Sequence, residues 1–162
     1  MGRKLLLQHI NEPGIHTFDV YRQKGGYRAV EKALKTMSTD EVVEEVKKSG
    51  LRGRGGAGFP TGMKWSCLAK PEGVARYLVC NGDESEPGTF KDRFLMTHIP
   101  HALIEGMIVS SYALGASVSY IYVRGEMMPQ IRILERAIQE AKAAGFLGTN
   151  ILGTGYNLEL YV

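Results

Sequence analysis

Residues 76–89 read RYLVCNGDESEPGT, an apolar run that passes directly into an acidic one. The apolar part, residues 76–80, is bounded by turn residues and predicts a short buried strand. The polar part, residues 81–89, holds three carboxylates, one amide and two hydroxyls. Ligands of open α/β sheets bind at the carboxyl ends of strands, so a site is expected here. A solvated acidic turn is the alternative, because Asn-Gly and Pro-Gly pairs are common in turns.

Two further strand patterns follow, each after a helical pattern. Residues 119–123 are rich in β-forming side chains, and residues 158–162 alternate as a strand does. Apolar spacing predicts one helix from Pro100 to about Gly115 and another over residues 129–144. The resulting order, βαβαβ, predicts an α/β fold with a parallel sheet.

The N-terminal part is expected to be a small helical segment. Residues 1–25 are punctuated by proline and glycine, and predict an extended arm that packs along a larger body. Apolar spacing predicts a helix over residues 27–37. Ser38 with Glu41 three residues later predicts a capping box at the start of a second helix, which should stop at Gly50.

Residues 51–65 read LRGRGGAGFPTGMKW, with five glycines in fifteen residues. Glycine lets the backbone approach a ligand closely, because no Cβ stands in the way. The cations of the segment are Arg52, Arg54 and Lys64, and its aromatic residues are Phe59 and Trp65. Amide donors and positive charge favour phosphate, and aromatic faces favour a planar ring. A nucleotide meets both requirements, so we expect a nucleotide-binding loop.

Other interpretations of this loop are less favoured by its context. The spacing Gly53-x-Gly55-x-x-Gly58 matches the dinucleotide fingerprint, but a helical pattern precedes it where the fingerprint requires a strand. A phosphate loop of the strand-loop-helix type is excluded, because no Gly-Lys-Ser/Thr follows the glycines. A flexible glycine-rich surface loop is the remaining alternative.

Composition limits the classes of protein to which this chain can belong. With 162 residues, 44% of them hydrophobic, the chain can bury one core. A net charge of +3 without a basic run does not favour nucleic acid as a partner. No apolar run approaches the 18 or so residues needed to cross a bilayer, so a cytosolic protein without direct membrane insertion is expected.

No metal site or disulfide framework is predicted. Cys67 and Cys80 form no CxxC pair, and each is expected to be a buried or half-buried thiol. His98 and His101 flank Pro100 without a third ligand nearby, which favours capping or surface roles over metal binding.

The chain ends within a strand pattern at Tyr161-Val162, where polar, frayed residues normally close a domain. We therefore expect a fragment with an incomplete domain. Residues 1–72 are assigned to the arm, the helices and the glycine-rich loop. Residues 73–162 are assigned to the first part of a sheet domain.

Four segments together resemble one family: residues 51–66, 79–93, 101–107 and 120–126. They are similar to the NADH-binding flavoprotein (51 kDa) subunit of bacterial respiratory complex I, over nearly the whole chain. The resemblance implies a Rossmann-like FMN-binding domain in which NADH stacks on the flavin. Two positions depart from the family: Gly82 stands where alanine is expected, and Cys67 where an aromatic residue is more usual.

The resemblance also implies the site residues. The flavin and nucleotide would be lined by Gly53, Arg54, Gly55, Gly56, Ala57 and Gly58, with Lys64 reaching the flavin. FMN would be contacted from the strand end by Asn81, Asp83, Glu84 and Ser85. Phe59 would stack on the NADH adenine, and Glu86 would contact the nicotinamide side. No catalytic residue is expected, because hydride passes directly to FMN, and Gly56 and Asp83 should face each other across one flavin.

The implied function is that of an NADH:quinone oxidoreductase, which passes hydride from NADH to FMN and then single electrons to iron-sulfur clusters. The cluster would belong to a C-terminal part outside this chain, and the fragment alone is expected to be inactive. Partners would be other peripheral-arm subunits, especially the small thioredoxin-like iron-sulfur subunit, at the cytoplasmic side of the inner membrane. The alternatives are a flavoprotein subunit of an NAD-linked hydrogenase or formate dehydrogenase, and a non-catalytic nucleotide-binding or assembly module.

Overall fold

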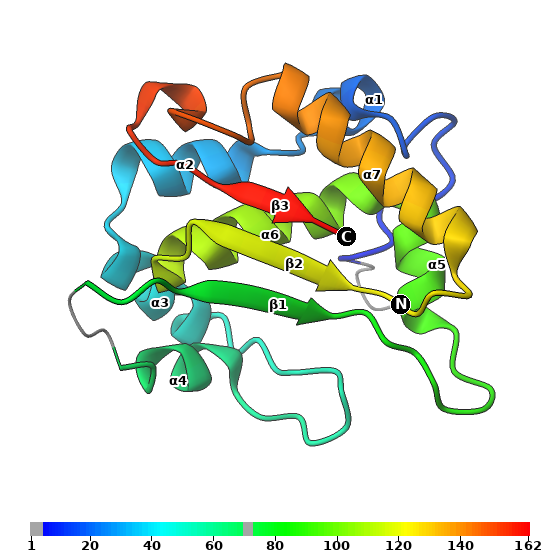
Figure 1. Ribbon diagram of the computed structural model, residues 1–162, viewed down its shortest axis with the longest axis horizontal. Coiled ribbons are helices and arrows are strands. Elements are labelled where there is room, and N and C mark those ends of the chain that lie inside the picture. The colour runs from blue at the N-terminus through cyan, green and yellow to red at the C-terminus, as the bar shows by residue number, and fades with distance from the viewer. Residues whose placement is uncertain (1–4, 70–72) are drawn as a thin grey trace.

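The computed structural model describes residues 5–69 and 73–162, and within these ranges it holds a three-stranded parallel sheet in the order β1-β2-β3 (Figure 1). The strands are β1 (Tyr77–Asn81), β2 (Val118–Tyr122) and β3 (Glu159–Tyr161). Asn81 at the end of β1 pairs with Tyr122 at the end of β2, so these two strands finish at the same edge. The α/β class and the parallel sheet are confirmed.

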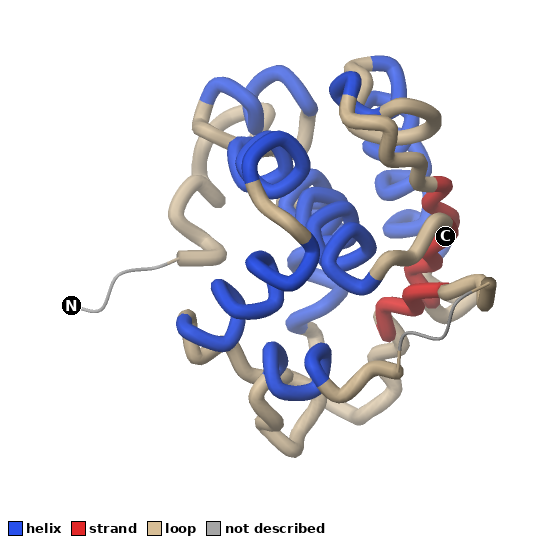
Figure 2. Tube along the Cα trace, turned by 90° about the vertical axis from the view of Figure 1, so that its left-hand side faces the viewer, coloured by secondary structure: helices blue, strands red, loops and turns tan. Residues whose placement is uncertain are grey.

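Helices connect the strands. Between β1 and β2 lie α5 (Lys91–His98) and α6 (Pro100–Leu114), and between β2 and β3 lies α7 (Met128–Ala143). The remaining helices are α1 (Phe18–Gln23), α2 (Arg28–Thr36), α3 (Thr39–Lys48), α4 (Thr61–Ser66) and the short 3-10 helix η1 (Ile151–Gly153). Figure 2 shows the strands along one side of the molecule, with most of the helices on the other.

The core lies between the sheet and the helices that cover it. Ile104 and Ile108 of α6, Ile121 of β2 and Leu134 of α7 are each at most 1% exposed. Helices α2 and α3 pack on α6, so the N-terminal helices share this core. The boundary at residues 72 and 73 stays a prediction.

The expectation that β1 is buried was wrong for one of its faces. Tyr77 and Val79 are 62% and 59% exposed, whereas Leu78 and Cys80 are half-buried against the core. A strand of a parallel sheet is buried on both sides only when helices cover both faces. Here α6 covers one face, and Tyr120 and Tyr122 of β2 continue the exposed face of β1.

The capping box at the start of α3 is confirmed. The Ser38 hydroxyl accepts from the Glu41 amide, and the Glu41 carboxylate accepts from the Ser38 amide. The helix stops where expected, because Gly50 has a left-handed φ of 67°. The glycine-rich loop therefore begins directly after a well-defined helix end.

The N-terminal arm is not extended over its described part. Residues 5–17 form a series of turns, and residues 18–23 form α1. So short a helix depends on tertiary packing more than on helix propensity. That packing comes from aromatic rings: Phe18 and Tyr21 contact Tyr27, and Phe18 also contacts Phe146.

His101 is fully buried, so the expectation of a capping or surface role was wrong for it. Its Nε2 lies 3.1 Å from the Glu140 carboxylate, and its Nδ1 lies 2.8 Å from the Tyr27 hydroxyl. A carboxylate accepts hydrogen bonds, so Nε2 carries the proton and Nδ1 accepts from Tyr27. His98 is exposed, as expected, and packs on the Phe94 ring. No group of side chains that could hold a metal ion occurs among the described residues.

The buried histidine predicts a pH dependence of stability. Burial lowers the pKa of His101 below its ordinary 6.5, and this outweighs the opposite effect of Glu140; His16 lowers it further. The unfolded chain therefore binds the proton first as the pH falls, so the free energy of unfolding should decrease below about pH 6.5. Phe18, Tyr21 and Tyr27 also pack around the ring, and the Tyr21 hydroxyl donates to the Glu105 carboxylate.

Urea unfolding at pH 7.5 and pH 5.5 measures this effect. The decrease in midpoint should be larger in the wild-type chain than in a His101→Gln variant, which has no titrating imidazole at this position. Equal decreases in both proteins would show that His101 does not contribute.

The two cysteines differ in environment. Cys80 is half-buried, and burial raises the pKa of its thiol. Cys67 is exposed at the C-terminal end of α4, so the expectation that it is at least half-buried was wrong. Both are free thiols, which agrees with the absence of a predicted disulfide framework.

Candidate functional site

The glycine-rich loop, residues 53–59, projects from a closed neck. Arg52 and Pro60 form an isolated antiparallel bridge, and the Gly53 amide donates to the Phe59 carbonyl at 3.0 Å. The Arg52 guanidinium donates to the Gly58 carbonyl across the base of the loop. Since both ends are fixed in this way, the position of the loop beside β1 is determined by its neck and by α4, which follows at once.

Backbone conformation requires glycine at two positions near the tip of this loop, and the space around the tip is open. Gly56 and Gly58 have φ values of 122° and 62°, which L side chains rarely adopt. Gly55 has no such φ, yet a Cβ added there would meet nothing within 4 Å, and the same holds at Gly56. The bare side of the tip therefore faces open space, and a bound molecule can approach the backbone there.

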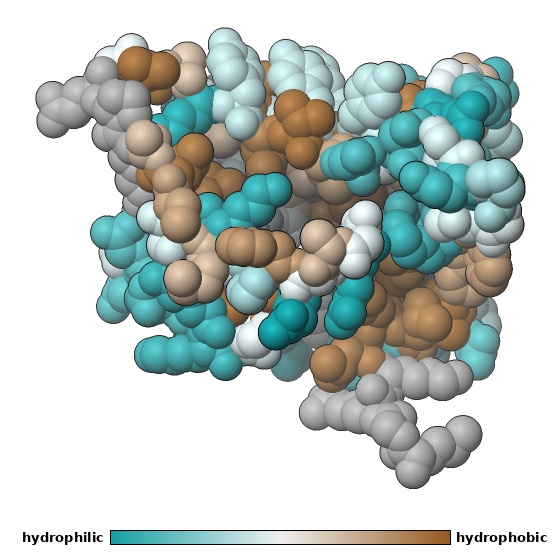
Figure 3. Space-filling model, turned by 90° about the horizontal axis from the view of Figure 1, so that it is seen from below, coloured by the Kyte–Doolittle hydropathy of each residue, from teal (hydrophilic) through white to brown (hydrophobic). Residues whose placement is uncertain are grey.

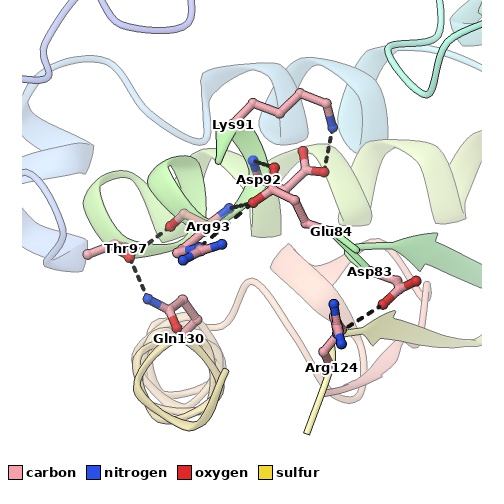
Figure 4. Close-up of polar contacts among 8 residues, drawn as sticks. All are labelled: Asp83, Glu84, Lys91, Asp92, Arg93, Thr97, Arg124 and Gln130. Carbon is pink, nitrogen blue, oxygen red and sulfur yellow. Dashed lines mark hydrogen bonds and ion pairs between the residues drawn. The ribbon is translucent and has the colours of Figure 1, made fainter. Parts of the chain in front are cut away.

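The acidic loop, residues 81–90, is ordered by bonds among its own side chains. The Asn81 side-chain oxygen accepts from the Asp83 amide at 2.9 Å, and the Ser85 hydroxyl donates to the Asp83 carboxylate. Arg124, which follows β2, places its Nε 3.8 Å from the same carboxylate (Figure 4). Asp83 is thus held between its own loop and the end of the neighbouring strand.

Glu84 points away from Asp83 and toward α5. Its two carboxylate oxygens accept from the amides of Asp92 at 2.8 Å and Arg93 at 3.1 Å (Figure 4). The residue is only 4% exposed. The acidic loop is therefore tied at its start to β1 and from its middle to the first turn of the next helix.

The two loops line one cleft of about 520 Å³. Its lining residues are Arg54, Gly55, Gly56, Asn81, Asp83, Glu84, Glu86, Thr89, Lys91 and Asp92. Gly56 and Asp83 therefore share a cleft, as the sequence predicted. Figure 3, which views the molecule from below, shows hydrophilic surface interleaved with weakly hydrophobic surface across its middle, and strongly hydrophobic surface at the lower right and toward the upper left.

Some predicted site residues lie outside this lining. They are Gly53, Ala57, Gly58, Phe59, Lys64 and Ser85. Ser85 still acts on the cleft through its bond to Asp83. Phe59 is 56% exposed, and Lys64 lines a separate hollow of about 440 Å³ with Trp65 and Tyr77, near the start of β1. The structure thus brings the tip of the glycine-rich loop to the acidic loop, but not these two side chains.

Three lining residues were missed by sequence reasoning: Thr89, Lys91 and Asp92. They lie in the run that continues the acidic segment, so proximity in sequence was an available signal. The Lys91 ammonium contacts the Asp92 carboxylate, whereas Arg54 has no hydrogen bond or ion pair within residues 5–69 and 73–162. Arg54 is therefore the cation of the cleft that is available to an anionic ligand.

Comparison with protein families identifies the family to which this chain belongs. A family model described as the Nuo51 FMN-binding domain matches residues 46–160, which include both loops. The chain belongs to this family. One curated relative is the NADH-quinone oxidoreductase subunit designated F from Aquifex aeolicus (strain VF5). It is 56% identical over 158 residues, covering 98% of this chain and 37% of that protein.

Two further comparisons support the same family membership. The NADH-quinone oxidoreductase subunit designated F 2 from Rhizobium meliloti (strain 1021) is 53% identical over 162 residues, covering the whole chain and 38% of that protein. A solved NAD+-reducing nickel-iron hydrogenase superposes with a TM-score of 0.67 at 34% identity, over 98% of this chain and 25% of that one. The chain thus spans well under half the length of these relatives. No described helix is long and apolar enough to cross a membrane.

Proposed function

We propose that this chain forms part of the FMN and NADH site of an NADH-quinone oxidoreductase flavoprotein subunit. The observation that carries the proposal is the shared cleft, in which the bare tip of the glycine-rich loop faces a cluster of carboxylates at a strand end. Membership of the Nuo51 FMN-binding family and the names of the two curated relatives support the same function.

The chemistry of the lining suits a flavin nucleotide. A cleft of about 520 Å³ falls within the range of roughly 300–1,000 Å³ typical of small-molecule sites. The bare backbone of Gly55 and Gly56 and the Arg54 guanidinium offer donors to phosphate or ring oxygens. The acceptors come from Asn81 and Asp83, which suit flavin N–H and ribityl hydroxyl groups.

The contribution of the chain is positioning. FMN, when bound, supplies the ring that accepts hydride from the nicotinamide. The two loops hold that ring between them, and Glu86, whose carboxylate lines the cleft, is assigned to the nicotinamide side. Phe59 and Lys64 keep their proposed roles at the adenine of NADH and at the flavin, from positions outside the lining of the cleft. Bringing the reacting atoms together is the main contribution of the protein to the rate of such a reaction.

The wider assembly belongs to the same proposal. The relatives are named as subunits, so other members of a complex are the proposed partners, above all the small thioredoxin-like iron-sulfur subunit. Iron-sulfur clusters that accept the electrons, and the quinone beyond them, would be bound outside residues 1–162. A cytoplasmic position at the inner membrane, reached through the complex, is proposed with them.

A second candidate is a flavoprotein subunit of an NAD-linked hydrogenase, because the hydrogenase chain superposes over nearly the whole of this one. The curated relatives favour the quinone-linked enzyme, since their sequence identity to this chain, 53–56%, exceeds the 34% of the hydrogenase chain. A non-catalytic nucleotide-binding module, the remaining alternative, would bind its ligand in the same cleft but would not reduce a flavin.

A chimaeric protein tests the proposal, with residues 1–162 replacing the matching segment of the Aquifex aeolicus relative. It should be purified with FMN, and NADH should bleach the visible absorption band of the flavin. FMN that stays oxidised in the presence of NADH would favour the binding module. A chimaera that folds but retains no FMN would contradict the proposal.

A further inference from the structure

Glu84 is the acidic residue whose burial stands out in the cleft. It is 4% exposed as a residue, and its side chain is 0% exposed. A carboxylate so far from water must be compensated by hydrogen bonds or charge. Two backbone amides of α5 provide this compensation, one to each oxygen, and the Arg93 Nε lies 4.0 Å from Oε2.

The start of α5 lacks the cap that a helix normally receives from its own sequence. Phe90 occupies the N-cap position and offers no side-chain hydrogen bond. The first amides of a helix have no partner within the helix, and negative charge is favoured near them. Glu84, eight residues before Asp92, fills the role that a neighbouring Ser or Asp would fill elsewhere.

Helix α5 is itself held in place. The Thr97 hydroxyl donates to the Arg93 carbonyl at 2.8 Å, and the Gln130 side chain of α7 donates to that hydroxyl at 3.1 Å (Figure 4). Its residue Met96 is buried in the core. A bond from Glu84 to the first turn of α5 is therefore a bond to a fixed part of the fold.

We propose that Glu84 is a positioning residue: its buried carboxylate fastens the acidic loop to α5 and thereby determines the positions of Asp83 and Glu86 in the cleft. The geometry supports this, because Asp83 and Ser85 flank Glu84 in sequence while its carboxylate turns to the other side. This refines the expectation that Glu84 contacts FMN directly, and its effect on the cofactor rests on the proposed function.

A consequence concerns the phosphate of the ligand. The amides at the start of a helix are a common phosphate site, and α5 begins in the lining of the cleft at Lys91 and Asp92. Glu84 already accepts hydrogen bonds from the amides of Asp92 and Arg93, and its negative charge would repel a phosphate. An anionic group of the ligand is thereby directed to the other wall, where Arg54 and the glycine amides lie.

Hydrogen exchange on the 162-residue chain without ligand tests the fastening itself. The amides of Asp92 and Arg93 should be protected in the wild type, and in Glu84→Ala they should exchange about tenfold faster or more. Acetate, which can take the place of the missing carboxylate, should slow them again. Glu86→Ala is the matched control, because this carboxylate is exposed in the same loop and should leave both amides unchanged.

Glu84→Gln serves where the alanine variant does not fold. It keeps the length of the side chain and one acceptor oxygen, so one of the two amides should lose protection and the other keep it. Unchanged exchange at both amides in the glutamine and alanine variants would overturn the proposal.

FMN content of the chimaeric protein tests the effect on the cofactor. Glu84→Ala should lower FMN retention together with the loss of amide protection, and acetate should restore both. A loss of FMN with unchanged amide exchange, or without rescue, would mean direct contact and would overturn the positioning role. Accelerated exchange in a chimaera whose wild type binds no FMN would instead contradict the proposed function and leave the fastening supported.

Discussion

Gly55→Val should weaken FMN binding to the chimaeric protein by about 100-fold or more, or about 2.7 kcal/mol. The reason is steric: a side chain at this position points into open space in the ligand-free chain, and under the proposed function the ligand occupies that space. Gly55 also has no left-handed φ, so the substitution should not strain the loop. FMN dissociation constants, measured by recovery of flavin fluorescence on release, give the result.

Gly125→Val is the matched control, because Gly125 also has an ordinary φ and open space around it but does not line the cleft. It should bind FMN as the wild type does. Gly56 is less suitable for the same test, since its φ of 122° would add backbone strain to any steric effect. Normal FMN affinity in Gly55→Val would show that the ligand does not approach this loop.

Asp83→Asn should lower FMN affinity by roughly tenfold to a hundredfold, because a hydrogen bond to a charged group contributes about 1.5–3 kcal/mol. The amide keeps the shape of the side chain and can still accept from the Ser85 hydroxyl, so the loop should persist. Equilibrium titration with FMN measures the change.

Glu86→Gln in the same loop provides the contrasting result. This carboxylate lines the cleft but is assigned to the nicotinamide side, so the variant should alter the KM for NADH and leave FMN content unchanged. If both substitutions affected FMN alone, or NADH alone, the assignment of the two carboxylates to different ligands would be contradicted.

Local signals in the sequence predicted the framework well. The capping box of Ser38 and Glu41 and the stop at Gly50 were visible because each depends on residues three or fewer positions from a helix end. The helices that became α6 and α7 were predicted to within a residue or two, since their apolar spacing is regular. The parallel sheet followed from the alternation of strands and helices.

Features that depend on distant contacts were not predicted. The burial of His101 comes from Tyr27 and Glu140, which lie 74 and 39 residues away in sequence. The exposed face of β1 has the same origin, because an apolar run does not reveal whether one face or both are covered. Helix α1 is stabilised by aromatic packing that no local sequence pattern predicts.

The candidate site was predicted in its two loops but not in its details. Family motifs located the glycine-rich and acidic segments, and the structure brings their central residues together. The direction of each side chain within the acidic loop was not available from sequence, so the hydrogen bonds from the amides of α5 to Glu84 were not predicted. The positions of Phe59 and Lys64 outside the cleft lining depend on the neck of the loop and on α4.

Hydrogen exchange of the chimaeric protein with and without FMN tests most directly whether the two loops hold one ligand. FMN should slow exchange of the amides in residues 53–58 and 81–86 together, with the same dependence on FMN concentration, while residues of the exposed face of β2 respond less. Protection confined to one loop, or half-saturation at different FMN concentrations for the two, would contradict the shared site.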